Sequence, residues 1–186
     1  MNIVLVGFMA SGKTSVGRRV AKRLGYRFMD MDQFIEKEQG RTISDIFAKE
    51  GEAHFRALET ALLRRMLHQE NTVISCGGGI VTTSGNIDLL KQIGITVFLN
   101  ADPEDILRRL EHDTRRPKVQ GGDLRERVIT LLGQRMPLYQ QADLSIHTLG
   151  KTPNQVAGEL IGKVAGHVKA APAPRGESSP ASPQAP

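Results

Sequence analysis

Residues 7–14 carry the clearest chemical signal in this sequence. They read GFMASGKT and match the pattern G-x-x-x-x-G-K-[ST]. Glycines let such a loop curl so that backbone N–H groups point at phosphate oxygens, and the helix that follows adds positive potential. Lys13 would place a cation on the phosphates, and the Thr14 hydroxyl can ligate Mg²⁺. The residues expected at the triphosphate are Ala10, Ser11, Gly12, Lys13, Thr14 and Ser15.

The surroundings of this loop support its assignment. Residues 2–6 (NIVLV) are typical of a buried strand, and residues 13–24 have one apolar helical face opposite a basic one. A strand before the loop and a helix after it are what the motif requires. The loop does not name the acceptor, so ATPases, GTPases, nucleotide kinases and small-metabolite kinases stay open. The lack of an Asn-Lys-x-Asp guanine motif disfavours GTPases.

The elements that must position this loop alternate between strand and helix patterns. Helices are indicated over residues 52–69, from the Asp102-Pro103-Glu104 start, and over about residues 152–168. Such alternation predicts an α/β fold with a five-stranded parallel sheet flanked by helices. The strands are expected at residues 2–6, 26–30, 72–76, 95–99 and 143–147.

Further residues suited to chemistry follow the loop in a fixed order. They are Asp30-Met31-Asp32, Phe55-Arg56 with Glu59, Gly77-Gly78-Gly79, Arg115-Arg116-Pro117 and the run RMPLY at residues 135–139. In this order and spacing, the sequence resembles the shikimate kinases from about residue 2 to residue 168. Each motif alone is weak, but together they are highly specific. The resemblance implies a fold like that of the P-loop nucleoside-monophosphate kinases, with a mobile lid.

The resemblance also implies the acceptor site. Asp32 matches the aspartate that binds a shikimate hydroxyl and serves as base, and Asp30 matches the one that helps hold Mg²⁺. Arg56 and Arg135 match the pair that binds the shikimate carboxylate. The Gly77–Gly79 turn, chiefly Gly78 and Gly79, matches a backbone contact to the ring. The implied reaction is ATP-dependent phosphorylation of the 3-hydroxyl of shikimate, in aromatic amino-acid (chorismate) biosynthesis.

On the nucleotide side, the resemblance again assigns roles by position. Arg116 matches a lid arginine that reaches the transferring phosphates, within a lid at about residues 112–123. Arg109, Lys151 and Pro153 fall where the family packs around adenine. The expected catalytic residues are Lys13, Asp32 and Arg116.

The chemistry of these residue types agrees with the resemblance. An arginine fork matches the two oxygens of a carboxylate, and Glu59 follows Arg56 by three residues, so it can orient the guanidinium on one helix face. An acid at the carboxyl end of a strand, such as Asp32, faces the crevice where open α/β sheets bind ligands. One departure stands out. Ala10 occupies a position where the family usually has glycine, which leaves the affinity for ATP open.

Composition bounds the remaining possibilities. The chain has 186 residues, one cysteine (Cys76) and a net charge of +5. A single cysteine excludes a disulfide framework, no run reaches the roughly 18 apolar residues of a membrane helix, and no signal peptide is evident, so we expect a cytoplasmic protein. The histidines lack zinc-ligand spacing. We expect one monomeric domain at residues 1–169 and a disordered tail at residues 170–186, rich in proline, alanine and serine.

Two alternatives remain at this point. A kinase similar to gluconate kinase would share the loop and the lid, but would not need the two arginines with Asp32. A non-catalytic nucleotide-binding or nucleic-acid-binding protein is suggested only by the sequence pI of about 9.6. With two tyrosines and no tryptophan, the chain offers few side chains for base stacking, so no nucleic-acid partner is expected.

Overall fold

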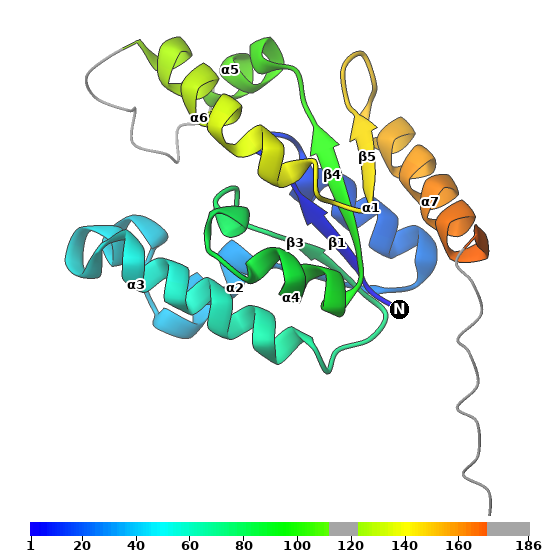
Figure 1. The fold of residues 1–186 in the computed structure, drawn as a ribbon, viewed down its shortest axis with the longest axis horizontal. Coiled ribbons are helices and arrows are strands. Elements are labelled where there is room, and N and C mark those ends of the chain that lie inside the picture. Colours follow the sequence, from blue (N-terminus) through cyan, green and yellow to red (C-terminus); the bar gives the residue numbers. More distant parts are fainter. Residues whose placement is uncertain (112–122, 171–186) are drawn as a thin grey trace, which may run out of the picture.

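The computed structural model describes residues 1–111 and 123–170, which fold around one parallel sheet (Figure 1). Its five strands lie in the order β2-β3-β1-β4-β5, and every neighbouring pair is parallel. All five predicted strands are confirmed. Their bounds are β1 (Ile3–Val6), β2 (Arg27–Asp30), β3 (Thr72–Ser75), β4 (Ile95–Asn100) and β5 (Leu144–His147).

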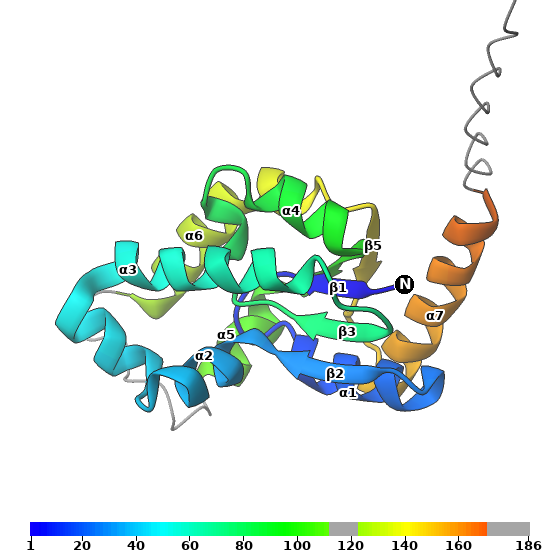
Figure 2. The ribbon, with the colours of Figure 1, turned by 90° about the horizontal axis from the view of Figure 1, so that it is seen from below.

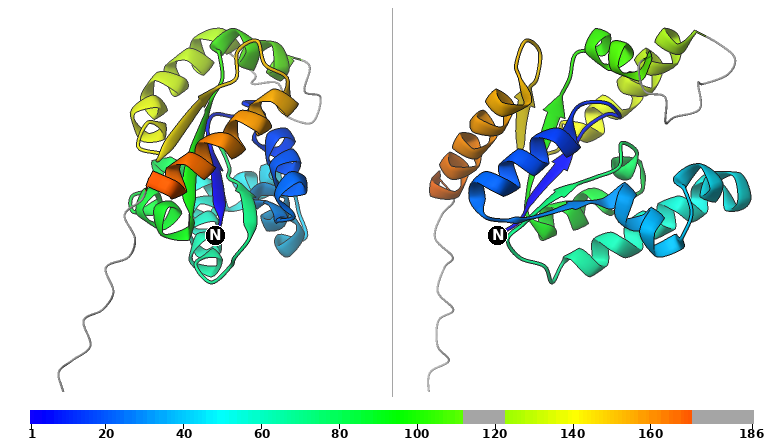
Figure 3. Two further views of the ribbon diagram at one scale, coloured as in Figure 1. Left: turned by 90° about the vertical axis from the view of Figure 1, so that its right-hand side faces the viewer. Right: turned by 180° about the vertical axis from the view of Figure 1, so that it is seen from behind.

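Helices cover both faces of the sheet (Figures 2 and 3). Helices α1 and α7 pack against each other on one face, and the others gather on the opposite face and around the carboxyl ends of the strands. Their bounds are α1 (Lys13–Leu24), α2 (Met31–Gln39), α3 (Ile43–Met66), the 3-10 helix η1 (Ile80–Thr82), α4 (Asn86–Ile93), α5 (Pro103–Glu111), α6 (Leu124–Tyr139) and α7 (Pro153–Ala170).

Successive side chains of the central strand, β1, belong to two different apolar clusters, one on each face of the sheet. In β1, Ile3 and Leu5 pack with α1 and α7, whereas Val4 and Val6 pack with the larger cluster on the other face. All four side chains are buried, which explains why this strand reads as one continuous apolar run. The loop after β1 therefore starts from a rigid, fully enclosed strand.

The long helix begins earlier than the sequence pattern indicated. The expected helix at residues 52–69 is the second part of α3, which starts at Ile43 behind a capping box between Thr42 and Asp45. The two parts meet at Gly51, whose φ of 83° and ψ of 173° are not helical. The apolar period restarts after this break, which is why the pattern showed only the second part.

Two predicted segments fall almost wholly outside the described residues. The expected lid (112–123) contributes only Asp123, the N-cap of α6, and the expected tail (170–186) only Ala170, the last residue of α7. In the part of the chain that the structure describes, no helix is long and apolar enough to cross a membrane.

Two helical glycines make a matched pair for testing the packing. A Cβ on Gly17 would lie 2.7 Å from the Phe28 ring and 3.0 Å from Leu5, so Gly17→Ala should lower the free energy of unfolding by about 1–3 kcal/mol. A Cβ on Gly162 would meet no atom within 4 Å, so Gly162→Ala should raise it by about 0.5–1 kcal/mol. Urea unfolding of both variants measures these changes. Equal stability of the two would contradict close packing of α1 on the sheet.

Candidate active site

The phosphate-binding loop joins β1 to α1 and is held by side-chain cations. A Cβ on Gly7, whose φ is 146°, would lie 2.8 Å from the carbonyl oxygen of Leu99, so the loop must begin with glycine. The Lys13 Nζ donates to the carbonyl oxygens of Gly7 and Phe8, each at 2.8 Å. The expected phosphate-binding cation is thus buried and lies against the loop itself.

The two expected metal ligands contact each other. The Thr14 hydroxyl donates to Asp30 Oδ2 at 2.7 Å, and Asp30 Oδ1 accepts from the backbone N–H of Gln33 at the start of α2. A hydroxyl and a carboxylate are oxygen ligands that suit Mg²⁺, which usually takes one or two carboxylates together with phosphates and water. The residues present therefore fit a magnesium site next to the loop.

The turn at Gly77–Gly79 brings the remaining site residues together. A Cβ on Gly77 would lie 2.6 Å from Glu59 Oε1 and 2.8 Å from Asp32 Oδ1. One on Gly78 would lie 3.0 Å from the backbone N of Met9 in the phosphate-binding loop, and one on Gly79 would overlap the guanidinium group of Arg56. Charged side chains of α2 and α3 and the phosphate-binding loop therefore all lie next to one short stretch of backbone.

The side chain of Glu59 is buried, and its two carboxylate oxygens differ in their hydrogen bonds. It is 0% exposed, and its Oε2 accepts from Arg56 Nη1 at 2.7 Å. Its Oε1 accepts no hydrogen bond from any residue in the described part of the chain. Burial raises the pKa of Glu59 to about 7, against the opposing effect of Arg56 and with a smaller upward contribution from Asp32. The predicted Arg56–Glu59 pairing on one helix face is present, with Glu52 as a further partner of Arg56.

A tyrosine that the sequence reasoning left without a role fixes the glycine turn. Tyr139 is fully buried, stacks on Phe98, and donates its hydroxyl to the Gly78 carbonyl oxygen at 2.5 Å. Burial raises its pKa to about 12, so it stays a donor. Arg135 Nη1 approaches the same oxygen at 3.4 Å and its guanidinium lies over the Phe8 ring. The run RMPLY contained the signal, because Arg135 and Tyr139 are four residues apart on α6.

The residues expected around adenine contact different partners in this structure. Arg109 of α5 donates to the carbonyl oxygen of Ala10, whereas the Lys151 ammonium pairs with Glu159 of α7 at 2.6 Å. Pro153 is the first residue of α7. Arg116 lies outside the described residues. Cys76 is buried in the larger core cluster, and burial raises the pKa of its thiol, so it is a small core side chain here.

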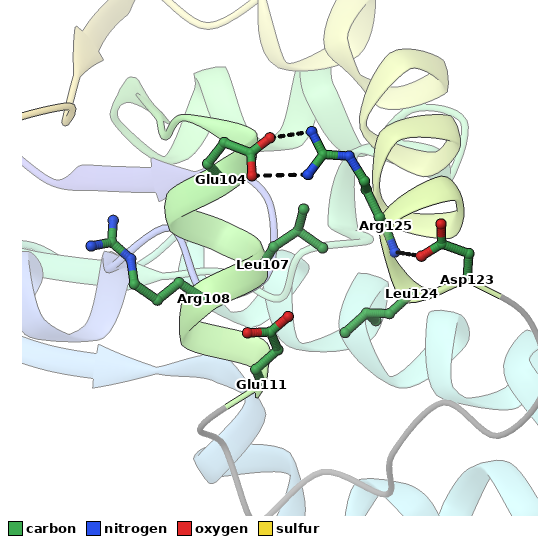
Figure 4. Close-up of a pocket in the computed structure, with 7 residues that line it drawn as sticks. All are labelled: Glu104, Leu107, Arg108, Glu111, Asp123, Leu124 and Arg125. Atoms are coloured by element: carbon green, nitrogen blue, oxygen red, sulfur yellow. Dashed lines mark hydrogen bonds and ion pairs between the residues drawn. The ribbon is translucent and has the colours of Figure 1, made fainter.

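A separate cavity of about 270 Å³ lies between α5 and α6 (Figure 4). Glu104 and Arg125 form an ion pair across it, and Asp123 accepts from the backbone of Arg125. The remaining lining residues are Leu107, Arg108, Glu111 and Leu124. Among the residues that the structure describes, the lining includes Asp123 of the expected lid but none of the residues predicted to contact ATP or the acceptor.

A phosphate-binding loop next to a cluster of arginines and carboxylates is typical of a P-loop kinase acting on a small molecule. The model of the shikimate kinase family matches residues 9–165. The chain is also 46% identical over 160 residues to a shikimate kinase of Thermodesulfovibrio yellowstonii, covering 86% of this chain and 92% of the relative. This chain belongs to the shikimate kinase family.

Solved structures agree with this assignment. A shikimate kinase from Acinetobacter baumannii in complex with shikimate matches with a TM-score of 0.84 and 38% identity, covering 89% of this chain and 93% of that one. A gluconokinase from Sinorhizobium meliloti matches with a TM-score of 0.56 and 19% identity, covering 90% and 93%, which shows a shared fold alone. The predicted family and fold class are confirmed, whereas the roles of the individual site residues remain predictions.

Glu59→Gln is expected to change how stability depends on pH. The Glu59 pKa is about 7 in the folded protein against an ordinary value of 4.5, so its contribution is full below pH 4.5 and is lost as the pH rises to 7. A shift of this size corresponds to about 3 kcal/mol. From pH 4.5 to 7.5, the unfolding free energy of Glu59→Gln should therefore rise by roughly that amount relative to that of the wild type.

Urea unfolding at a series of pH values provides the measurement. Glu126→Gln, at an exposed position of α6, is a matched control that should follow the wild-type pH curve. If the difference in unfolding free energy between Glu59→Gln and the wild type stays constant across this pH range, burial does not raise the pKa of the Glu59 carboxyl.

Proposed function

We propose that this protein transfers the γ-phosphoryl group of ATP to the 3-hydroxyl of shikimate, which yields ADP and shikimate 3-phosphate. The observation that carries the proposal is the Gly77–Gly79 turn, which contacts Asp32, Glu59, Arg56 and the phosphate-binding loop at once. An acceptor held at this turn would lie next to the nucleotide phosphates. Such positioning is most of what phosphoryl transfer requires.

The acceptor carboxylate would bind between Arg56 and Arg135. Both guanidinium groups lie at the glycine turn, Arg56 beside Gly79 and Arg135 at the Gly78 carbonyl. Two arginine forks can offer parallel N–H groups to a planar carboxylate. Glu59 holds Arg56 in place from the buried side, so this arginine is oriented before the substrate arrives.

Asp32 would act on the reacting hydroxyl. Its carboxylate lies beside Gly77 at the start of α2. As the acceptor oxygen bonds to the γ-phosphorus, the bond from that phosphorus to the bridging oxygen of ADP breaks, and the hydroxyl proton passes to Asp32. The carboxylate also orients the hydroxyl, because the oxygen must approach in line with the leaving group.

Positive charge around the phosphates would come from three sources. Lys13 and Arg116 would supply positively charged side chains, and Thr14 with Asp30 would hold Mg²⁺. When bound, Mg²⁺ neutralises charge on the phosphate oxygens. We also propose that the protein acts as a monomer in the cytoplasm, where ATP is available. In support of a monomer, the large exposed apolar side chains in the described part of the chain lie on different segments, for example Phe47 on α3, Ile129 on α6 and Leu149 between β5 and α7.

A kinase acting on another hydroxy-acid and a non-catalytic nucleotide-binding protein are the alternatives. The first assay is ADP release by the purified protein with ATP and Mg²⁺, with shikimate, with gluconate, and with no acceptor. We expect strong stimulation by shikimate alone. Asp32→Asn should reduce that stimulated rate by about 10²–10⁴-fold, because it removes the proton acceptor. Stimulation by gluconate instead, or by neither acceptor, would contradict the proposal.

The carboxylate role of the arginines predicts a selective effect on the acceptor. Arg56→Ala and Arg135→Ala should each raise the KM for shikimate by about tenfold or more, because each removes charge-assisted hydrogen bonds worth roughly 1.5–3 kcal/mol. The KM for ATP should change by less than about threefold. Steady-state kinetics with each substrate varied in turn measures both values.

Arg65→Ala is the matched control for these variants. Arg65 lies on the same helix as Arg56 but forms an exposed pair with Glu38, so its removal should leave both KM values unchanged. Equal effects of Arg56→Ala or Arg135→Ala on the two substrates would contradict a role at the acceptor carboxylate.

A further inference from the structure

The phosphate-binding loop contains a strained alanine. The backbone N–H of Ser11 donates to the carbonyl oxygen of Phe8 at 3.2 Å, which closes a turn over residues 8–11. Ala10 is the third residue of this turn and has a φ of 58°, whereas Met9 before it has a negative φ. Turns with a positive φ at this position require glycine or asparagine, because a Cβ crowds the backbone there. Ala10 is therefore held in a conformation that its side chain disfavours.

Arg109 contacts the loop at this residue. Its Nη1 donates to the Ala10 carbonyl oxygen at 2.8 Å, across 99 positions of sequence. The same nitrogen lies 3.7 Å from where a Cβ on Gly12 would stand, so it lies next to two of the loop residues that have a positive φ, Ala10 and Gly12. The peptide between Ala10 and Ser11 is consequently held at both ends, at its carbonyl by Arg109 and at its N–H by Phe8.

Two other carbonyl groups of the loop also accept hydrogen bonds from a positively charged side chain. Lys13 binds the carbonyl oxygens of Gly7 and Phe8, so the two cations together engage three of the loop's peptides from two different helices. A hydrogen bond to a carbonyl fixes the plane of its peptide, and with it the direction of the following N–H. The shape of the loop therefore depends on these contacts as well as on its glycines.

We propose that Arg109 is a positioning residue of the phosphate-binding loop, which holds the strained Ala10–Ser11 peptide in the geometry that receives phosphate. This role differs from adenine packing, because it acts through the loop and requires no base on the ligand. It rests on the proposed function only in that the loop binds the phosphates of ATP. On this proposal the contribution of Arg109 to phosphate binding depends on the alanine at position 10, since a glycine there would adopt the same φ without support.

A double-mutant cycle tests this dependence. The variants are Arg109→Met, which keeps the apolar stem and removes the donors, Ala10→Gly, and the two combined. Binding of inorganic tripolyphosphate and of ADP, each with Mg²⁺ and no acceptor, is measured by titration calorimetry. Tripolyphosphate is the base-free probe, so contacts with adenine cannot contribute to its affinity.

We expect Arg109→Met to weaken tripolyphosphate binding about tenfold with Ala10 present, since left-handed strain of this kind is equivalent to roughly that factor. In the Ala10→Gly background the same change should weaken binding by no more than about threefold. Ala10→Gly alone should bind tripolyphosphate at least as well as the wild type. Glycine has no side chain with which to contact Arg109 or the ligand. If Ala10→Gly restores the affinity that Arg109→Met loses, the loss is not explained by the missing charge alone.

Arg108→Met is the matched control. Arg108 is the exposed neighbour on α5, and its guanidinium pairs with Asp105 instead of the loop. Its loss removes the same charge from the same helix, so it should change tripolyphosphate affinity less than twofold if the Ala10 contact is what matters. An equal loss from Arg109→Met in both backgrounds, no loss in either, or an equal loss from Arg108→Met would each overturn the proposal.

Failure of the proposed function can be told apart from failure of this inference. The calorimetric cycle uses no acceptor, so it is decisive even if shikimate does not stimulate ADP release. Conversely, shikimate-dependent turnover by the wild type would stand if the cycle showed simple additivity.

Discussion

The close approach of the Gly77–Gly79 turn to its neighbours is the constraint on which the site depends. Each glycine lacks a Cβ where a different partner lies: two carboxylates at Gly77, the phosphate-binding loop at Gly78 and a guanidinium at Gly79. Any side chain here would separate groups that, on our proposal, must lie within contact distance for phosphoryl transfer. The turn follows β3, and β3 pairs with both β1 and β2, so sheet register brings it next to the loop after β1 and to Asp32 after β2. Arg56 and Glu59 reach the turn from α3.

Cations bound to backbone carbonyls are the second organising feature. Lys13 lies on the carbonyls of Gly7 and Phe8, Arg109 on that of Ala10, and Arg135 approaches that of Gly78. Lys13 is expected at the phosphates and Arg135 at the acceptor carboxylate, whereas Arg109 is proposed to act through the loop. These hydrogen bonds already restrict the three side chains, so less side-chain entropy remains to be lost if an anion binds.

Local patterns in the sequence were enough to predict the five strands, the phosphate-binding loop and the family. Those signals are a continuous apolar run, a glycine-lysine-threonine motif and an ordered set of short motifs. The contacts of Tyr139 with Gly78, of Arg109 with Ala10 and of Lys151 with Glu159 were not predictable in this way. Two of them join residues 61 and 99 positions apart, and such pairings are set by sheet order and helix packing. Nor did helical periodicity reveal the early start of α3, because Gly51 interrupts it.

The pairing of Arg56 with Glu59 explains how the site can tolerate a buried carboxylate. Glu59 is fully buried beside Asp32, and desolvation disfavours its charge. Arg56 offsets this only in part, because it also binds Glu52 and, on our proposal, the substrate carboxylate. A second anion at Arg56 would share the cation on which Glu59 relies, so binding the acceptor should favour a proton on Glu59. Arg56 would then pair with Glu59 before the acceptor binds and with the acceptor carboxylate afterwards. The Gly77–Gly79 turn, which has no side chains, leaves both carboxylates within contact distance of Arg56.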